Sequence, residues 1–436
     1  MHRRFWAGPV AAAISGILLT CGGSDGEALG SRADTPQPEP SGPVAAGIAV
    51  GIDVLLRDSL QLVRGKRVGL VTNQTGLGIG RTAAGADSLM RTVDLLHDHP
   101  DLDLVALYSP EHGLSGAVNA GERIATARDE RTGLPIYSLY GETKEPLPGM
   151  LEGVDVLLFD IQDVGARYYT YVWTMALSMR AGGAAGIPFV VLDRPNPIGG
   201  ALVQGNVLDT AYASFIGLYP VPMRHGMTVG EVARMVRGEW GVEADLRVVP
   251  MDGWRRDLWY DDTELTWTPP SPNMPSVESA AHYPGTCLFE GTNLSVGRGT
   301  ERPFQWIGAP WLDGAALAER LNAYALPGVR FEAATFTPSK PGDAKWPSTE
   351  VHGVRFVMTD ASVYDPITAA VAALVEAKRM AGANWKWIVP HIDQLAGTDQ
   401  LRRMIDEGRS VADITATWKE PLAAFVQKRE SYLIYR

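Results

Sequence analysis

The segment Leu102–Gly113, with the sequence LDLVALYSPEHG, is an apolar run that ends abruptly at a proline, a carboxylate, an imidazole and a glycine. Its apolar residues are consecutive rather than alternating, which predicts a strand buried on both faces of a sheet. Three further segments repeat this design: RVGLVTNQTG at 67–76, VDVLLFDIQDVG at 154–165 and PFVVLDRPNP at 188–197. We therefore predict a parallel sheet built from these four strands.

Polar side chains follow each of these strands at the point where the apolar run stops. In an open parallel sheet, ligands bind in the crevice outside the carboxyl ends of the strands. The residues expected at that edge are Asn73, Gln74, Glu111, His112, Asp160, Gln162, Asp163, Asp193, Arg194 and Asn196. We predict that the functional site lies there.

The chain has 436 residues, which is too long for one ordinary core and predicts two domains. A fifth strand, LRVVPM at 246–251, and the alternation of strands with helices predict a doubly wound α/β domain over 49–265. A connector rich in Trp, Asp and Pro follows. We predict that 266–436 forms a smaller α+β domain that completes the cleft.

Helices are predicted from apolar spacing and from capping residues. Leu89, Val93 and Leu96 are at helical spacing and predict a helix over 82–97. The GxGxG pattern at 76–80 lacks the final spaced glycine of a dinucleotide-binding fingerprint, so we interpret it as a turn. Further elements are predicted as a helix with a Thr228–Glu231 capping box, a helix at 313–322, a strand at Val354–Thr359, and a helix that begins at Asp365 and Pro366.

The overall charge limits the classes of partner. A formal net charge of −11, with 20% charged residues, argues against nucleic acid and anionic membrane surfaces as electrostatic partners. A basic pocket for a small acidic ligand is compatible with this charge. The sequence does not determine the oligomeric state.

The N-terminus has the features of an export signal. Arg3 and Arg4 precede an apolar run at Val10–Leu19, which is too short to span a membrane as a stable helix. The following LLTC, ending at Cys21, resembles a bacterial lipobox, although Thr before the cysteine is less usual. We predict a signal peptide over 1–21, a disordered tether over 22–48, and a lipid-anchored protein of the cell envelope or periplasm. An ordinary signal peptide without lipidation is the alternative.

Several kinds of catalytic site find little support in the motifs. No HExxH, CxxC or paired-histidine spacing occurs, so a catalytic metal is only an alternative and no cofactor is predicted. No GxSxG elbow occurs, and Cys287 has only His282 nearby, so covalent catalysis is weakly supported. With Cys21 as the only other cysteine, no disulfide framework is expected.

Carboxylate chemistry remains. A glutamate behind a proline at a strand end, such as Glu111, can have its pKa raised by desolvation and act as a general acid. Glycoside hydrolysis is the reaction class that most often uses such a group. The alternative for Glu111 is a loop carboxylate that accepts hydrogen bonds from backbone amides. For Asp163 and Arg167, a structural ion pair at i, i+4 stands beside a functional role.

The sequence resembles the NamZ-type exo-β-N-acetylmuramidases, a family first catalogued as a domain of unknown function. Eight motifs in the same order carry the resemblance from about Gly51 to the C-terminus: GLVTNQTG, SPEHG, AGE at 120–122, DIQDVGARYYTY, LDRPNPIGG, RHGMTVGE, PSPNMP and EGTNLSVGRGT. The resemblance implies a Rossmann-like catalytic domain, a smaller C-terminal domain, and release of terminal β-linked N-acetylmuramic acid from the non-reducing end of peptidoglycan fragments. One departure is Val296, where the family more often has a glutamate.

The matching motifs suggest roles for individual residues. Glu111 is the expected acid, His112 is expected to orient it or contact the sugar, and Asp160 and Asp163 are candidates for a second acid–base or water-positioning role. The expected substrate-binding residues are Asn73, Gln74, Arg167, Tyr168, Arg194, Arg224, His225, Glu290, Asn293 and Arg298. Guanidinium groups among them suit the lactyl carboxylate of muramic acid, and Arg224 also precedes a helix N-terminus that favours anions. Alternatives are a non-catalytic peptidoglycan-binding lipoprotein and a metal-dependent hydrolase that uses the same cleft.

Overall fold

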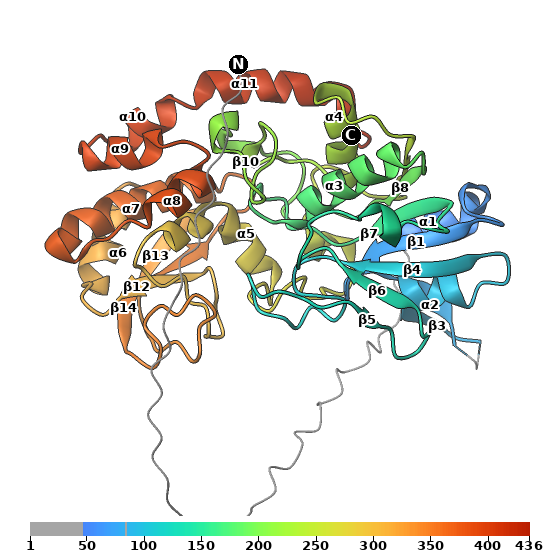
Figure 1. Cartoon of the computed structure of the whole chain (residues 1–436). Helices are drawn as coiled ribbons and strands as arrows, with labels where there is room; N and C mark the ends of the chain where they lie inside the picture. Colours follow the sequence, from blue (N-terminus) through green and yellow to red (C-terminus); the bar gives the residue numbers. More distant parts are fainter. Residues whose placement is uncertain (1–46, 83–84) are drawn as a thin grey trace, which may run out of the picture. The chain divides into compact units, whose positions relative to one another are not determined.

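The centre of the fold is a seven-stranded sheet in the order β11-β8-β7-β1-β4-β6-β5 (Figure 1). We describe it from a computed structural model, which covers residues 47–82 and 85–436. The strands are β1 (Arg67–Thr72), β4 (Asp103–Ser109), β5 (Ala127–Arg128), β6 (Pro135–Ser138), β7 (Val156–Asp160), β8 (Phe189–Leu192) and β11 (Leu246–Val249). All neighbours are parallel except β5 and β6, which confirms the predicted, mostly parallel α/β sheet.

The strand order reverses direction around β1. This strand pairs with β4 on one side and with β7 on the other, so that Val68 lies beside both Leu104 and Val156. The chain builds β4 and β6 outward on one side before it builds β7, β8 and β11 on the other. Reversal points of this kind form the ligand sites of doubly wound sheets. The loops that follow β1, β4 and β7 therefore meet at one edge.

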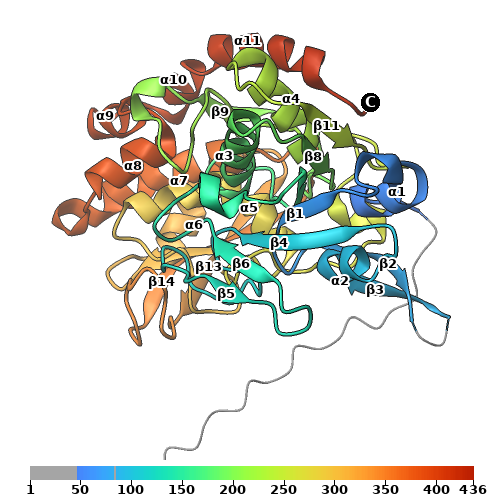
Figure 2. The same ribbon diagram turned by 45° about the vertical axis from the view of Figure 1, so that its right-hand side comes forward.

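Helices cover both faces of the sheet, as Figures 1 and 2 show. Alternate residues of one strand enter different cores, because successive side chains point to opposite faces. Val156 and Leu158 belong to the cluster with α1 (Gly51–Asp58) and α2 (Thr92–His97). Leu157 and Phe159 belong to the cluster with α3 (Tyr171–Ala184) and α4 (Val229–Glu239). Burial on both faces explains the continuous apolar runs of the sequence.

The predicted helix over 82–97 is wrong. The chain instead forms an antiparallel hairpin of β2 (Leu77–Arg81) and β3 (Asp87–Arg91), and only α2 is helical. Glycines allow the hairpin to pack closely: a Cβ at Gly78 would lie 2.7 Å from Ile52 Cγ2, and one at Gly80 would lie 2.4 Å from Met90 Sδ. The GxGxG pattern thus forms a closely packed strand, not the predicted turn.

The rest of the chain builds a second sheet and a set of helices. The antiparallel sheet has the order β12-β14-β13, with β12 (Trp306–Ala309), β13 (Val329–Phe336) and β14 (Val351–Met358). The helices are α5 (Val277–Thr286), α6 (Gly314–Asn322), α7 (Pro366–Ala381), α8 (Val389–Ala396), α9 (Gln400–Asp406), α10 (Val411–Ala416) and α11 (Lys419–Arg429). A two-stranded pair, β9 (Gln204–Val207) and β10 (Pro222–Arg224), lies between α3 and α4 in the chain.

Capping chemistry places several of these helices where the sequence predicted them. Asp365 Oδ1 accepts hydrogen bonds from Ile367 N and Thr368 N at the start of α7. Thr228 and Glu231 form the predicted capping box of α4, so Glu231 has the structural role expected of it.

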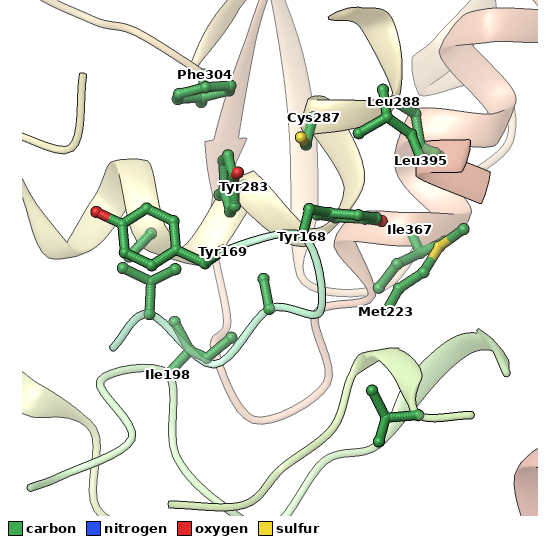
Figure 3. Packing of buried hydrophobic residues seen from close by; sticks show 14 of the residues in the cluster. Tyr168, Tyr169, Ile198, Met223, Tyr283, Cys287, Leu288, Phe304, Ile367 and Leu395 are labelled. Atoms are coloured by element: carbon green, nitrogen blue, oxygen red, sulfur yellow. The ribbon is translucent and has the colours of Figure 1, made fainter. Parts of the chain in front are cut away.

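The two predicted domains share one hydrophobic cluster. Tyr168 and Tyr169, just before α3, lie among Tyr283 and Cys287 of the second part (Figure 3). The described residues all fall in a single compact unit. No helix within the described part of the chain is both long and apolar enough to cross a membrane. The predicted signal peptide, Cys21 and most of the tether lie outside the described residues, and the predicted boundary near 265 stays a prediction.

Candidate active site

Glu111 lies directly beyond β4, at the edge where the sheet order reverses. Its side chain is held from two sides: Gly121 N donates to Oε1 at 3.0 Å, and Thr170 Oγ1 donates to Oε2 at 2.7 Å. The residue is only 8% exposed. A carboxyl group fixed by two donors, one of them a hydroxyl that can also accept, has a defined orientation from which it can transfer a proton.

His112 adopts an unusual backbone conformation beside it. Its φ of +71° lies in the left-handed region, which is rare for residues other than glycine and often marks functional sites. His112 Nδ1 lies 2.6 Å from Val118 O, so Nδ1 carries the proton and a neutral ring leaves Nε2 as an acceptor. Burial lowers the pKa of His112; Glu111 opposes this change and Arg298 adds to it. The ring is therefore neutral at neutral pH.

Three tyrosines connect Glu111 to the second part of the chain. Tyr171 OH donates to Pro270 O at 2.5 Å and lies 3.5 Å from Glu111 O. Tyr169 packs edge-on against Tyr171, with ring centroids 4.8 Å apart. It also packs edge-on against Tyr283 of α5, with centroids 5.8 Å apart, and these two rings are seen in Figure 3. Charged groups of the second part are thereby held near the end of β4.

The second part contributes a buried ion pair, Glu290 and Arg298. Arg298 Nε donates to Glu290 Oε1 at 2.7 Å, and the two side chains are 11% and 15% exposed for Arg298 and Glu290 respectively. Burial raises the pKa of Glu290, but Arg298 and Lys345 lower it more, so the net pKa is below its usual value. Lys345 Nζ donates to Phe289 O, Glu290 O and Leu294 O. Glu290 is thus an ionised carboxylate in the short 3-10 helix Cys287–Gly291, and its predicted contact with substrate stays a prediction.

Asp163, after β7, is a buried carboxyl with one unused oxygen. Oδ2 accepts from Gly165 N at 2.7 Å, whereas Oδ1 has no hydrogen-bond partner among the described residues. Burial raises the pKa of Asp163 to about 7, and the backbone N–H groups of Gly165 and Val164 oppose the rise. A carboxyl group that titrates near neutral pH suits acid–base chemistry, which the sequence predicted for it. That role is untested.

We expect Asp163→Asn to change the pH dependence of stability. A folded-state pKa above the ordinary value of 3.8 means that ionisation above about pH 4 favours the unfolded chain, so Asp163 destabilises the wild type as the pH rises toward 7 and beyond. The melting temperature of the asparagine variant minus that of the wild type should therefore be larger at pH 8 than at pH 5. Glu152→Gln, at an exposed position, is the control. An equal difference at both pH values would contradict the raised pKa.

Asp160 and Arg194 are paired with each other. Arg194 Nε and Nη2 donate to the two oxygens of Asp160 at 2.6 and 2.9 Å, and Thr92 Oγ1 also donates to Asp160. Arg194 Nη2 further donates to Leu77 O. Both charges are satisfied inside the fold, so the pair has a structural role, and the catalytic and carboxylate-binding roles predicted for it stay predictions.

Arg167 is also engaged within the fold. Its guanidinium is fully buried and donates to four carbonyl oxygens, those of Asn206, Val221, Leu395 and Ala396. The predicted ion pair with Asp163 is therefore wrong. Tyr168 OH donates to Pro284 O, so Tyr168, like Arg167, connects the first part of the chain to the second.

Arg224 and His225 lie in the interior at the end of β10. Arg224 is 1% exposed and donates to Gln204 Oε1 at 2.9 Å and to Ile198 O, so it is engaged within the fold, and its predicted contact with a lactyl carboxylate stays a prediction. Burial and the charge of Arg429 lower the pKa of His225 to about 3. Among the described residues, no hydrogen bond connects the neutral, buried imidazole of His225 to Glu111.

The three predicted amide groups differ in their availability. Asn293 uses Oδ1 and Nδ2 in backbone contacts with Lys386 and Asn384, and so holds a loop. Asn73 Nδ2 and Gln74 Oε1 are buried without a hydrogen-bond partner in the described chain. Both follow β1, beside the loop that carries Glu111. These two amides therefore retain groups with which to bind a polar ligand.

Sequence reasoning missed Thr170, Tyr140 and Lys144. Tyr140 and Lys144 follow β6, the strand beside β4. Burial raises the pKa of Tyr140, and the Glu111 charge adds to this rise. The signal in the sequence for Tyr140 and Lys144 was their place in a long, charged connection after the SPEHG motif, and that for Thr170 was its place in the DIQDVGARYYTY motif. Among the described residues, no group of three or more His, Cys, Asp or Glu side chains could hold a metal ion.

Two family models match almost the whole described chain. They are described as exo-beta-N-acetylmuramidase NamZ, N-terminal, matching 68–278, and exo-beta-N-acetylmuramidase NamZ, C-terminal, matching 281–435. The chain belongs to this NamZ family. A relative from Bacillus subtilis (strain 168), described as peptidoglycan beta-N-acetylmuramidase NamZ, is 45% identical over 389 residues, which are 89% of this chain and 91% of the relative.

Solved structures support the same family fold. A crystal structure of a DUF1343 family protein from Bacteroides fragilis NCTC 9343 matches this NamZ family member with a TM-score of 0.81 and 35% identity, over 89% of this chain and 99% of that one. A second such protein from the same organism matches with a TM-score of 0.71 and 31% identity, over 90% and 99%. The α/β fold predicted from the sequence is therefore shared with experimentally determined structures.

Proposed function

We propose that this protein is an exo-acting glycosidase that releases terminal β-linked N-acetylmuramic acid from the non-reducing end of peptidoglycan fragments. The observation that carries the proposal is the Glu111 carboxyl group, held by Gly121 N and Thr170 Oγ1 at the reversal point of the sheet. The 45% identity to a peptidoglycan β-N-acetylmuramidase supports the substrate class. Muramyl glycans derived from peptidoglycan are the proposed substrates.

In this proposal Glu111 protonates the glycosidic oxygen as the leaving group departs. The hydrogen bonds from Gly121 and Thr170 hold the carboxyl group in one orientation, which fixes the place from which it can transfer a proton. Neutral His112, with Nδ1 committed to Val118 O, offers Nε2 as an acceptor for a sugar hydroxyl. Positive charge develops on the sugar ring in the transition state of glycoside hydrolysis. The ionised Glu290 and the titratable Asp163 are candidates to stabilise that charge or to position water.

The test is an assay of purified protein with nitrophenyl β-N-acetylmuramide, nitrophenyl β-N-acetylglucosaminide and a natural muramyl disaccharide. We expect hydrolysis of both muramyl substrates and much slower hydrolysis of the glucosaminide. Measurable binding of muramyl glycans without any turnover would instead support a non-catalytic peptidoglycan-binding protein. Activity that disappears with a chelator and returns with added metal would support a metal-dependent hydrolase.

We further propose that the protein is exported and lipid-anchored through Cys21, behind the basic and apolar N-terminal segment. We expect Cys21→Ser, expressed in a bacterial host, to move the protein from the membrane fraction to the soluble fraction, because a stable anchor requires the acyl chains. Cys287→Ser is the matched control, since that thiol is buried within the fold. Unchanged fractionation of the Cys21 variant would remove the anchor.

A further inference from the structure

The loop after β6 carries a lysine whose charge is not neutralised by a direct partner. Lys144 Nζ lies 3.0 Å from the centroid of the Tyr140 ring and 4.8 Å from that of Phe215. Among the described residues, neither an ion pair nor a hydrogen bond engages this ammonium group. Aromatic faces attract a cation but leave its N–H groups free for an anionic ligand. The chain therefore holds a positive charge in a defined place.

The loop itself is fixed beside the catalytic edge. Leu139 N donates to Ser109 O at 2.8 Å, two residues before Glu111. At its other end, Glu145 pairs with Arg180 of α3 at 2.7 Å. Burial has the largest effect on the pKa of Lys144 and lowers it; the charge of Glu111 raises it and that of Arg123 lowers it. Glu142, on the same loop, is exposed. Lys144 is thus within electrostatic reach of the proposed proton donor.

Four other cationic side chains already donate hydrogen bonds to groups of the fold. Arg298 is paired with Glu290, and Lys345 donates to three carbonyl oxygens. Arg167 and Arg224, which the sequence suggested for a carboxylate, are buried and engaged within the fold. The exposed Arg123, which also acts on Lys144, is solvated, whereas Lys144 is partly buried between aromatic rings. A negatively charged ligand group beside Glu111 would therefore find free N–H donors in Lys144.

We propose that Lys144 binds the lactyl carboxylate of the terminal N-acetylmuramic acid and thereby makes the site prefer muramic acid to N-acetylglucosamine. This inference rests on the proposed function. In an exo-acting enzyme the sugar that is cleaved at C1 also carries the lactyl ether at O3, so the carboxylate lies across one sugar ring from the oxygen that Glu111 protonates. Lys144 follows β6, which pairs in parallel with the strand that leads to Glu111, so both residues lie at the same edge of the sheet.

The experiment compares the full chain with Lys144→Met, which keeps the apolar stem and removes the charge. The substrates are nitrophenyl β-N-acetylmuramide and the same compound with its lactyl carboxylate converted to an amide. We expect the ratio of kcat/KM for the acid to that for the amide to fall by about 10- to 100-fold, mainly through KM, because a hydrogen bond to a charged group is lost. Lys144→Arg should recover most of the ratio. Lys419→Met, on the exposed start of α11, is the matched control.

Calorimetry of the binding of free N-acetylmuramic acid and N-acetylglucosamine distinguishes a failure of the Lys144 role from a failure of the proposed function. A wild-type protein that hydrolyses the muramide while Lys144→Met keeps the full preference for the acid would overturn the role of Lys144 alone. A wild-type protein that neither binds N-acetylmuramic acid nor hydrolyses the muramide would overturn the proposed function, and this inference with it. Circular dichroism and melting temperature confirm that each variant is folded.

Discussion

Replacing Glu111 with glutamine is expected to lower turnover of a muramyl disaccharide by about 10²- to 10⁴-fold, the usual cost of removing a general acid. Glutamine keeps the size of the side chain and can still accept hydrogen bonds from Gly121 N and Thr170 Oγ1, so the fold should persist. It carries no titratable proton for the leaving oxygen. The measurement is kcat and kcat/KM on the disaccharide, with circular dichroism as the folding check.

The leaving group provides an internal control for this assignment. A nitrophenolate departs with little protonation, so Glu111→Gln should lose much less activity on nitrophenyl muramide than on the disaccharide. Glu142→Gln, at an exposed position of the loop that carries Lys144, is the matched variant in which the same chemical change should have little effect. A folded Glu111→Gln protein with near-normal activity on the disaccharide would disprove the proton-donor role and direct attention to Asp163 and Glu290.

Arg167→Met is expected to destabilise the protein by about 1–3 kcal/mol for each buried carbonyl group that is left without its hydrogen-bond donor. The guanidinium donates to Leu395 O and Ala396 O at the C-terminal end of α8, and to two carbonyls of the β9–β10 region. A cation at a helix C-terminus also interacts favourably with the helix dipole. Its removal leaves buried carbonyl groups without their donor, which lowers the free energy of unfolding.

Chemical denaturation of the two arginine variants Arg167→Met and Arg180→Met would measure this effect. Arg180 pairs with Glu145 in an exposed position, and exposed pairs of this kind contribute about 0–1 kcal/mol. Arg167→Lys should also lose stability, because an ammonium group has three N–H donors and cannot serve four carbonyls. A decrease of less than about 1 kcal/mol in the free energy of unfolding of Arg167→Met would show that the four carbonyls find other partners and that stability does not depend on this side chain.

The edge of the sheet was predictable because its signals are local. Four continuous apolar runs, each stopped by polar residues and Gly or Pro, predicted β1, β4, β7 and β8, and hence the place of Glu111 and His112. The hairpin after β1 was not predictable from apolar spacing. Its close packing depends on contacts of Gly78 and Gly80 with side chains from α1 and β3, which no pattern of hydrophobic residues reports.

The roles of the charged residues, like the hairpin, depended on tertiary contacts that the sequence pattern does not report. Arginine is a residue type expected to bind a carboxylate ligand, but the N–H donors of Arg167, Arg194 and Arg224 are used by backbone carbonyls and by Asp160. Lys144 drew no attention in the sequence, because its importance depends on the parallel pairing of β6 with β4. A side chain's availability to a ligand is decided by what already occupies its hydrogen-bonding groups, and that is a property of the folded chain.

By itself, the sequence determined the α/β class, the motif that presents Glu111, and the family to which the chain belongs, since buried strands, caps and motifs are encoded within short stretches. Only the tertiary structure decided that Asp160 neutralises Arg194, that Arg167 caps α8, and that Lys144 remains free beside Glu111. These outcomes join residues such as Arg167 and Ala396, which are 229 positions apart in the chain. Spacing along the sequence carries no information about such pairs, because the donor and acceptor meet only when the strands and helices between them have packed.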